Sequence, residues 1–339
     1  MPANLTIDDI AEALGVSKTT VSRAISGKGR ISKETTDRVR AYIEEHNYKP
    51  NVYAQGLAKQ CTRNIGVIWP SDTEAETLPF FQKCLLGINK VTAREGYDLL
   101  LTITSESEDE TEALRRIVEN HKVDGIILTR TLVRDAAADY LQEAGIPFVS
   151  IGNCEDPKRI CVDNENELAC TALTKHLLDM GIGRLALIGG SLSHVISRTR
   201  LRGFQKGFEV VGKAPDPNLI YMGVRHAEEI EQAVLQLMGR GAEVIIGMDD
   251  RITGEILSVC HRKGIAVPGQ LRLASFYDSA LLEHAVPAVT SVQFDDAALG
   301  AAAAQTLLAL LRGEVVESQY LSNYRIQLRE TMHEGERKE

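Results

Sequence analysis

Apolar residues near the start of the chain recur with the period of a helix. They follow the i, i+3, i+4, i+7 spacing that gives a short helix one apolar face: Ile7, Ile10, Ala11 and Leu14. Thr6 precedes them as a capping residue, and Gly15 follows them with the freedom that a tight turn needs. Ser17 is then placed to cap a second helix that Val16 and Val21 anchor. The pattern predicts a helix, a glycine turn and a second helix.

A third helix is expected over residues 33–46, because Ser32 is a capping residue and Val39 and Ile43 lie on one face. Pro50 ends this region. Residues 51–59 are polar but keep helix formers around Leu57. They are either an inert tether or a helix that forms only against a partner, since isolated helices below about 12 residues are marginal.

From Asn64 onward, short apolar runs alternate with longer amphipathic stretches. Four runs are typical of strands: 65–69, 99–101, 125–128 and 147–151. The rhythm then repeats with three more: 184–189, 244–247 and 271–275. Strands that alternate with helices indicate parallel sheets. We therefore predict an α/β fold class: an N-terminal all-α headpiece followed by two similar parallel-sheet lobes with a cleft between them.

The second predicted helix begins with a dense row of hydrogen-bond donors, which favours an acceptor-rich partner. In a helix-turn-helix, the start of the second helix meets base edges in the major groove, so Lys18 and Thr19 are the expected base-reading residues. The remaining donors would contact phosphates or support the helix: Ser17, Thr20, Ser22 and Arg23. The alternative from the pattern alone is an ordinary surface helix pair.

A family resemblance joins these segments. Residues 16–23 spell Val-Ser-x-x-Thr-Val-Ser-Arg, and residues 47–51 and 54–58 read Asn-Tyr-Lys-Pro-Asn and Ala-Gln-Gly-Leu-Ala. Together with Ile31-Ser32 they closely resemble the headpiece and hinge of the lac repressor (LacI) family, and the resemblance continues to about residue 330. It implies a DNA-binding protein with a periplasmic-binding-protein-like effector domain.

The resemblance implies a helix-turn-helix headpiece at 1–49 and a hinge at 50–62. It places the first lobe at 63–161 with 292–321 and the second at 162–291 with 322–339, so the chain would cross near residues 162, 291 and 322. The expected DNA contacts are Thr6, Ser17, Lys18, Thr19, Thr20, Ser22, Arg23, Asn51, Ala54 and Leu57. Leu57 would act as a wedge in the minor groove, as a hinge leucine does in this family.

Ligands of open α/β sheets bind beyond the carboxyl ends of the strands, so effector contacts are expected there. The resemblance suggests Asp72, Phe80, Phe81, Arg130, Asn153, His194, Arg198, Asp249, Tyr277, Asp278 and Phe294. Arginine forks and carboxylates match vicinal hydroxyls, and aromatic rings cover the apolar face of a sugar. Structural ion pairing remains the alternative for the charged residues, and Phe80 and Phe81 could equally belong to the core.

Four positions depart from the usual pattern of the family: Gly152, Met248, Tyr277 and Phe294. The first three stand where Asp, Asn and Asp are frequent, and the last where Gln is frequent. The cleft is therefore less rich in carboxylates and more aromatic than a typical sugar site. We expect a sugar-like effector, and leave open a modified or oligomeric sugar, a sugar acid and a non-sugar metabolite.

Charge is distributed unevenly. The whole chain of 339 residues has a net charge of -9, whereas residues 1–60 carry nine Lys and Arg against seven Asp and Glu. A slightly basic head on an acidic body fits a DNA-binding module joined to a domain with another task. The hydrophobic content of 44% is enough for more than one buried core.

The six cysteines contain no C-x-x-C pair, and we expect all of them to be reduced core residues: Cys61, Cys84, Cys154, Cys161, Cys170 and Cys260. The N-terminus lacks the pattern of a signal peptide, and the longest apolar stretch, Ala297 to Leu311, is too short to span a bilayer. These features predict a cytoplasmic protein with no membrane partner, metal or cofactor.

An enzyme, or a metabolite-binding protein with a vestigial headpiece, is the competing class. Residues 207–214 nearly spell a P-loop, but Ala214 lacks the hydroxyl that holds Mg²⁺ and the stretch closes a helix. No H-E-x-x-H or G-x-S-x-G motif occurs. A regulator would need two headpieces in a homodimer. The small-residue face of the helix expected at 295–312, built from Leu299, Gly300, Ala303 and Ala304, is a candidate for that interface.

Overall fold

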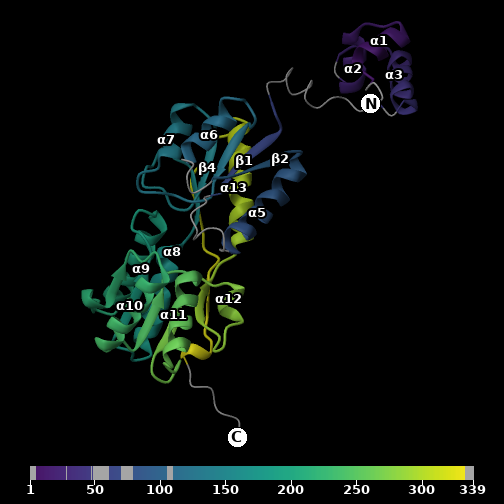
Figure 1. Ribbon diagram of the computed structural model, residues 1–339. Coiled ribbons are helices and arrows are strands. Elements are labelled where there is room, and N and C mark those ends of the chain that lie inside the picture. The colour runs from purple at the N-terminus through teal and green to yellow at the C-terminus, as the bar shows by residue number, and fades with distance from the viewer. Residues whose placement is uncertain are drawn as a thin grey trace. The chain divides into compact units, whose positions relative to one another are not determined.

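The computed structural model describes residues 5–27, 29–46, 48, 61–69, 79–104 and 110–332 (Figure 1). The chain divides into two compact units, Met1–Thr62 and Arg63–Glu339, and each is described by itself.

The described residues of the first unit form three helices: α1 (Ile7–Leu14), α2 (Lys18–Ser26) and α3 (Lys33–Glu45). Thr6, Ser17 and Ser32 each accept a hydrogen bond from the amide three residues ahead, at 3.3, 3.1 and 3.1 Å. Such caps satisfy amides that have no partner within the helix. The helices enclose a small core: Ile10, Ala11, Val21, Ala24, Val39 and Tyr48. The three predicted helices and their caps are confirmed.

Gly15 makes the turn between α1 and α2. Its φ of 63° is left-handed, and its amide donates to the carbonyl of Glu12. The next amide, that of Val16, reaches back to the carbonyl of Ala11 at 3.0 Å. A side chain at position 15 would be strained by this φ, so glycine fixes the angle between the two helices.

The first sheet of the second unit has the strand order β11-β5-β4-β3-β1-β2, and all neighbours are parallel. Its strands are β1 (Asn64–Trp69), β2 (Asp98–Ile103), β3 (Gly125–Leu128), β4 (Phe148–Ile151), β5 (Cys161–Asn164) and β11 (Gln319–Leu321). One face is covered by α5 (Pro79–Thr92) and α13 (Asp296–Leu311), and the other by α6 (Glu110–Val118) and α7 (Ala136–Glu143). This sheet and its helices are called the first lobe.

The second sheet has the order β12-β10-β9-β8-β6-β7, parallel except for β12 against β10. Its strands are β6 (Leu185–Gly189), β7 (Ile220–Met222), β8 (Val244–Gly247), β9 (Arg272–Ser275), β10 (Thr290–Gln293) and β12 (Arg325–Gln327). Its helices are α8 (Asn166–Asp179), α9 (Val195–Val210), α10 (Ala227–Gly239), α11 (Asp250–Lys263) and α12 (Ala280–Glu283). This second lobe shares one large core.

The chain passes between the lobes three times (Figure 1). It leaves the first sheet after Asn164, returns after Gln293 and leaves again after Leu321. These positions lie within a few residues of the crossings expected near 162, 291 and 322. The strands at the crossings, β5, β10, β11 and β12, were not predicted as strands because they are short and carry polar residues.

Helices α5 and α13 pack with their backbones in contact. A Cβ atom at Gly87 would lie 2.0 Å from the carbonyl oxygen of Ala297, and one at Gly300 would lie 2.1 Å from that of Cys84. Gly300, with Leu299, Ala303 and Ala304, is therefore buried inside the first lobe. This corrects the expectation that these small residues form a dimer interface, because the face is already covered by α5 and the sheet.

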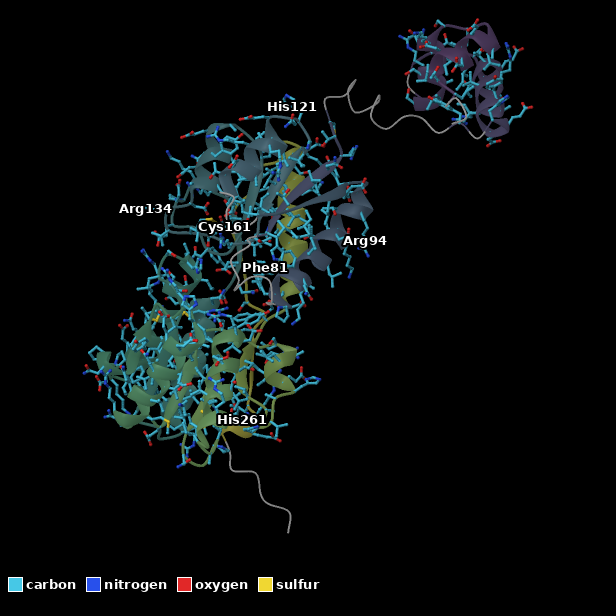
Figure 2. All side chains as sticks on the ribbon, viewed as in Figure 1. Phe81, Arg94, His121, Arg134, Cys161 and His261 are labelled. Carbon is cyan, nitrogen blue, oxygen red and sulfur yellow. A yellow bond between two sulfur atoms is a disulfide. The ribbon has the colours of Figure 1, made fainter. Side chains whose placement is uncertain are left out.

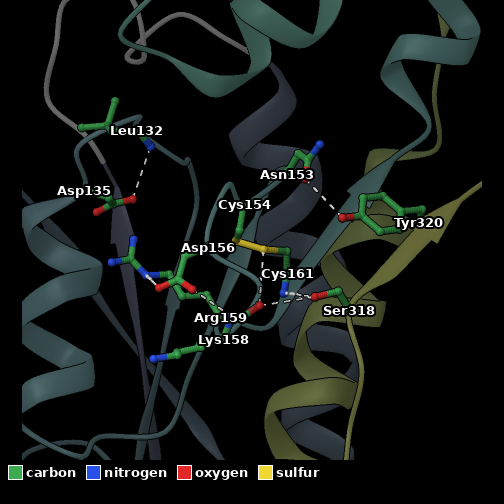
Figure 3. Close-up of a disulfide and its surroundings, with 10 residues drawn as sticks. All are labelled: Leu132, Asp135, Asn153, Cys154, Asp156, Lys158, Arg159, Cys161, Ser318 and Tyr320. Carbon is green, nitrogen blue, oxygen red and sulfur yellow. Dashed lines mark hydrogen bonds and ion pairs between the residues drawn. A yellow bond between two sulfur atoms is a disulfide. The ribbon is translucent and has the colours of Figure 1, made fainter.

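The cysteines also differ from the prediction. Cys154 and Cys161 form a disulfide in the β4–β5 connection, with their Cα atoms 6.1 Å apart (Figure 3). The connection turns back on itself, which brings two thiols seven residues apart within bonding range. Cys84, Cys170 and Cys260 are free and buried, as expected. Burial raises the pKa of Cys170 to about 12 and that of Cys260 to about 11, so both stay protonated and inert.

The close helix approach yields a stability prediction. Gly87→Ala should lower the free energy of unfolding by about 1–3 kcal/mol, because a backbone oxygen occupies the place of the new methyl group. Gly239→Ala in α10 is the matched control, since nothing lies within 4 Å of its Cβ position. The control should gain up to about 1 kcal/mol from helix propensity. Urea unfolding of the full chain measures both, and equal effects would contradict the proposed backbone contact.

Candidate functional site

The first candidate site is the exposed face of α2. Lys18, Thr19, Ser22 and Arg23 are all exposed, whereas Val21 and Ala24 on the opposite face are buried. Lys18 pairs with Asp8, but both side chains are more than half exposed, so the pair is weak and easily exchanged for another anion. This helix thus presents a row of donors to solvent at the second position of a helix-turn-helix.

The other predicted DNA contacts fall into two groups. Ser17 and Thr20 hydrogen-bond each other through their hydroxyls at 2.8 Å, and Thr6 forms a capping box with Asp9. Thr6, Ser17 and Thr20 therefore stabilise the N-terminal ends of their helices. The hinge residues Asn51, Ala54 and Leu57 lie outside the described residues, as does Asp72 of the effector set.

The second candidate site is a cavity of about 170 Å³ between the two lobes. Its walls come from the residues that follow the parallel strands: Thr129 to Thr131 after β3, Gly152 after β4, Gly190 after β6, Met248 to Asp250 after β8, and Tyr277 after β9. Asp163 and Asn164 at the end of β5 also line it, together with residues of α5 and α9. The location agrees with the rule that open α/β sheets bind ligands beyond their carboxyl edges.

One wall of the cavity is aromatic. Phe80 meets the ring of Tyr277 edge to face, with centroids 6.1 Å apart, and Tyr277 stacks on Phe294 at 6.5 Å. Phe81 lies beside them, and Figure 2 labels it where the two lobes meet. These rings come from both lobes. Phe80, Phe81, Tyr277 and Phe294 therefore line the cavity, and their contact with an effector stays a prediction.

Polar groups face that wall. Asp249 caps α11 by accepting from the amide of Ile252 at 2.7 Å, and Asp163 accepts from the amide of Asn164 and from the Nδ2 of Asn166. The Oδ1 of Asn164 is buried and accepts no hydrogen bond from any described residue. A buried acceptor without a donor at a cavity wall suits a ligand hydroxyl.

Burial dominates the electrostatics of two of these carboxyl groups. Desolvation raises the pKa of Asp163 to about 6, although its hydrogen bonds and the nearby guanidinium of Arg200 act in the opposite direction. Desolvation also raises the pKa of Asp250. The cavity therefore holds carboxylates whose charged form is costly, and which a donor-rich ligand would stabilise.

The cation that lines the cavity in α9 is Arg200, not Arg198. Arg200 donates to the carbonyl of Met248 at 2.7 Å and to the Oδ1 of Asn166 at 3.3 Å, and its guanidinium lies 5.6 Å from the Tyr277 ring centroid. Arg198 instead faces Glu155 at 3.4 Å, and both side chains are over two-fifths exposed. The sequence contained the signal, because Arg200 continues the buried stripe of Phe204 and Gly207 at helical spacing, whereas Arg198 does not.

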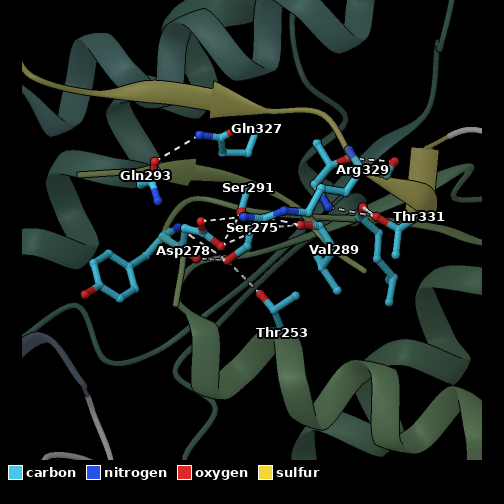
Figure 4. A network of polar contacts seen from close by, with 12 residues as sticks. Thr253, Ser275, Asp278, Val289, Ser291, Gln293, Gln327, Arg329 and Thr331 are labelled. Atoms are coloured by element: carbon cyan, nitrogen blue, oxygen red, sulfur yellow. Dashed lines mark hydrogen bonds and ion pairs between the residues drawn. The ribbon is translucent and has the colours of Figure 1, made fainter. Parts of the chain in front are cut away.

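Of four further predicted residues, two lie outside the cavity and two line it. Asp278 is buried away from the cavity and forms a two-pronged ion pair with Arg329, at 2.7 and 2.8 Å (Figure 4). Asn153 accepts from the hydroxyl of Tyr320 outside the cavity (Figure 3). His194 and Arg130 do line it, and Arg130 also pairs with Glu110 at 3.2 Å.

A backbone bridge joins the two lobes next to Thr131 and His194 of the cavity lining, and this place is called the mouth. The amide of Val133 in the first lobe donates to the carbonyl of Ser193 in the second at 2.9 Å, and the amide of Val195 donates to that of Thr131 at 3.2 Å. Separation of the lobes at this place would break both hydrogen bonds, so the two amides can report such an opening.

Asp163 yields a pH prediction. The pKa of the Asp163 carboxyl is higher in the folded protein than in the unfolded chain, so the folded state holds this proton more tightly. The stability that results is fully present below about pH 4 and is lost as the pH rises through about 6. Asp163→Asn should remove this loss. Between pH 4 and 7 the free energy of unfolding of the variant should rise relative to that of the wild type by on the order of 2–3 kcal/mol. Urea unfolding of both proteins across this range tests it. Parallel pH profiles would show that the Asp163 carboxyl is not desolvated.

Among the described residues, no helix is long and apolar enough to cross a membrane. Nor does any group of three or more His, Cys, Asp or Glu in that part of the chain have the arrangement of a metal site.

Comparisons with known proteins agree with this architecture. A family model described as "Bacterial regulatory proteins, lacI family" matches residues 6–51, and one described as "Periplasmic binding protein-like domain" matches residues 174–332. The structure of the transcriptional regulator CelR in complex with cellobiose is similar to this one, with a TM-score of 0.73 and 26% identity. The match covers 96% of this chain and 99% of the CelR chain. The structure of the lac repressor dimer bound to operator and the anti-inducer ONPF has a TM-score of 0.79, and the match covers 96% of this chain and 98% of the lac repressor chain. The identity is 24%, so this likeness supports the fold alone.

Sequence similarity to a known regulator extends over almost the entire chain. The HTH-type transcriptional regulator MalR of Staphylococcus xylosus is 30% identical over 323 residues, which are 93% of this chain and 94% of MalR. The predicted family resemblance and fold class are thereby confirmed. With a headpiece, two parallel-sheet lobes and a relative of this extent, the chain belongs to the lacI family of bacterial regulatory proteins.

Proposed function

We propose that this transcriptional regulator binds a palindromic DNA operator as a homodimer and represses transcription. A small effector in the cavity between the lobes, a sugar or sugar derivative, controls the affinity for that operator. The observation that carries the proposal is the cavity itself, because it combines an aromatic wall with opposed carboxylates and a buried arginine at the edges of two sheets.

The headpiece supports the DNA half of the proposal. The first turn of α2 offers exposed donors on a helix that Gly15 and the Ser17 cap hold in place. One headpiece reads only a half-site, so sequence-specific binding requires two copies of the chain. The lac repressor, which shares this fold, is a dimer in its complex with operator. A cytoplasmic location is part of the same proposal, because the operator DNA of a bacterium lies there.

The composition of the cavity supports the effector class. Aromatic rings cover the apolar face of a sugar, while Asp249, Asp163 and Arg200 can hydrogen-bond its hydroxyls. Two of the similar proteins are a regulator solved with cellobiose and a regulator named MalR. The extra aromatic residues Tyr277 and Phe294 favour a ligand with more apolar surface than a free hexose, such as a disaccharide.

Two experiments test the two halves separately. Selection of duplexes from a random palindromic library, followed by gel shift at fixed salt, tests operator binding. Thermal shift against maltose, cellobiose, sugar acids and non-sugar metabolites tests the cavity, because a ligand that binds only the folded state raises the melting temperature. A chain that binds ligands but no DNA sequence would instead be a metabolite-binding protein with a vestigial headpiece.

One prediction of the proposed function concerns base reading by Lys18 and Thr19. Replacing both with Ala should change which operator is preferred, at a cost of about 1–3 kcal/mol for each lost base contact. Lys33→Ala is the control, since Lys33 is an exposed lysine in the first turn of α3 and should leave the preference unchanged. Repeating the selection with each variant measures the preference. A uniform loss without a change in sequence preference would remove Lys18 and Thr19 from base reading.

The second prediction compares Arg200 and Arg198. Arg200→Lys keeps the charge but loses the planar fork, and should weaken ligand binding about tenfold or more, as expected for a lost hydrogen bond to a charged group. Arg198→Lys is the matched control on the same helix and should bind within about threefold of wild type. Calorimetry with the ligand found by thermal shift measures both. The opposite ranking would restore the assignment made from the sequence.

A further inference from the structure

The lobes touch through a buried side-chain contact beside the cavity, made by Tyr277 of its aromatic wall. Tyr277 belongs to the second lobe and directly follows β9, whereas Asp296 is in the first turn of α13 in the first lobe. The Tyr277 hydroxyl donates to the Oδ2 of Asp296 at 2.7 Å. Tyr277 is 4% exposed and Asp296 1% exposed, so the bond is sealed from water.

Asp296 has few other partners. The Nζ of Lys83 lies 3.6 Å from Oδ2, on a side chain that is nearly half exposed, and Oδ1 is buried with no hydrogen-bond partner among the described residues. Burial raises the pKa of Asp296 to about 6, although Tyr277, Lys83 and Arg200 oppose this effect. Burial and the adjacent Asp296 carboxylate both raise the pKa of Tyr277, which therefore remains a hydrogen-bond donor. The hydroxyl of Tyr277 is thus the principal group that compensates this buried carboxylate.

This contact differs in kind from the ion pair at the surface between the lobes. Arg198 and Glu155 also join the two lobes, but both are well exposed, and such pairs contribute little. A hydrogen bond to a buried charged group is stronger, and its loss leaves the charge without compensation. Of these two side-chain contacts, Tyr277 with Asp296 is the one that can bias the arrangement of the lobes.

We propose that Tyr277 and Asp296 form a latch that holds the lobes closed, with the Tyr277 ring serving as cavity wall and its hydroxyl as the latch. The inference rests on the proposed function, because a latch beside the cavity regulates the protein only if the cavity binds an effector. Ring and hydroxyl are one rigid group. A ligand that packs on the ring, between Phe80, Phe294 and Arg200, therefore acts directly on the bond between the lobes.

Hydrogen exchange of the full chain without DNA or ligand tests the latch. The reporter amides are those of Val133 and Val195, whose hydrogen bonds cross the cavity mouth, and the internal reference is β8, which lies wholly within the second lobe. Tyr277→Phe keeps the ring and removes the hydroxyl. It should speed exchange at the mouth about tenfold or more and leave β8 unchanged, because only opening between the lobes becomes easier.

The matched control is Tyr320→Phe, which removes a tyrosine hydroxyl that bonds Asn153 within the first lobe. It should leave exchange at the mouth unchanged. Asp296→Ala removes the same bond but also the buried charge, so its effect should be smaller than that of Tyr277→Phe, and Tyr277→Phe should add little in the Asp296→Ala background.

Three results would overturn the latch: unchanged exchange at the mouth in Tyr277→Phe, an equal rise in β8, or effects of the two substitutions that multiply in the double variant. The experiment uses neither operator nor effector, so its failure speaks against the latch alone. Failure of duplex selection and thermal shift would speak against the proposed function and leave this measurement intact.

Discussion

The carboxyl edges of two parallel sheets face each other because the chain crosses between them three times. Parallel strands deliver all their following loops to one edge, so each sheet concentrates its loop residues on the side that the crossings bring together. Arg130 and Tyr277 are far apart in sequence, yet both line one cavity. The aromatic wall, the carboxylates and Arg200 all depend on this single topological constraint.

The same topology determines which parts of the molecule can move. Within the first lobe, α5 and α13 touch through Gly87 and Gly300, and within the second, Gly203 and Gly207 of α9 lie against α8 with no room for a methyl group. Helices in such close contact cannot slide past each other without separating, so these two helix pairs resist rearrangement within their lobes. We therefore expect a change in the cavity to act mainly at the crossings and at the contacts between the lobes.

The sequence predicted what local pattern controls. The caps of the three headpiece helices and the buried strands β1, β3 and β8 were predicted because their signals lie within a few neighbouring residues. Strands β5 and β10 were missed because their polar residues serve the crossings and the cavity. The small face around Gly300 was misassigned as an interface, since sequence shows that a close approach occurs but not which helix makes it.

Site residues were harder to predict than elements because a motif fixes a segment and not a side-chain direction. Arg198 and Arg200 are two residues apart, yet a helix turns about 200° over that distance, so one faces Glu155 and the other the cavity. The pair of Cys154 and Cys161 was missed for a related reason, because the β4–β5 connection turns in a way that no spacing rule describes. Both errors concern direction in space.

Buried charge links the cavity to the behaviour expected of the regulator. Asp163 and Asp296 both have a raised pKa because desolvation exceeds the help of their hydrogen bonds, so the closed cavity carries a free-energy cost at neutral pH. Asn164 adds a buried acceptor that has no donor among the residues that the structure describes. A ligand with several hydroxyl groups would offset part of that cost at Asp163 and Asn164 of the first lobe, and it would favour closed lobes by also contacting Arg200 and Tyr277 of the second. Differential affinity for one arrangement of the lobes is the thermodynamic condition under which a ligand shifts a conformational equilibrium.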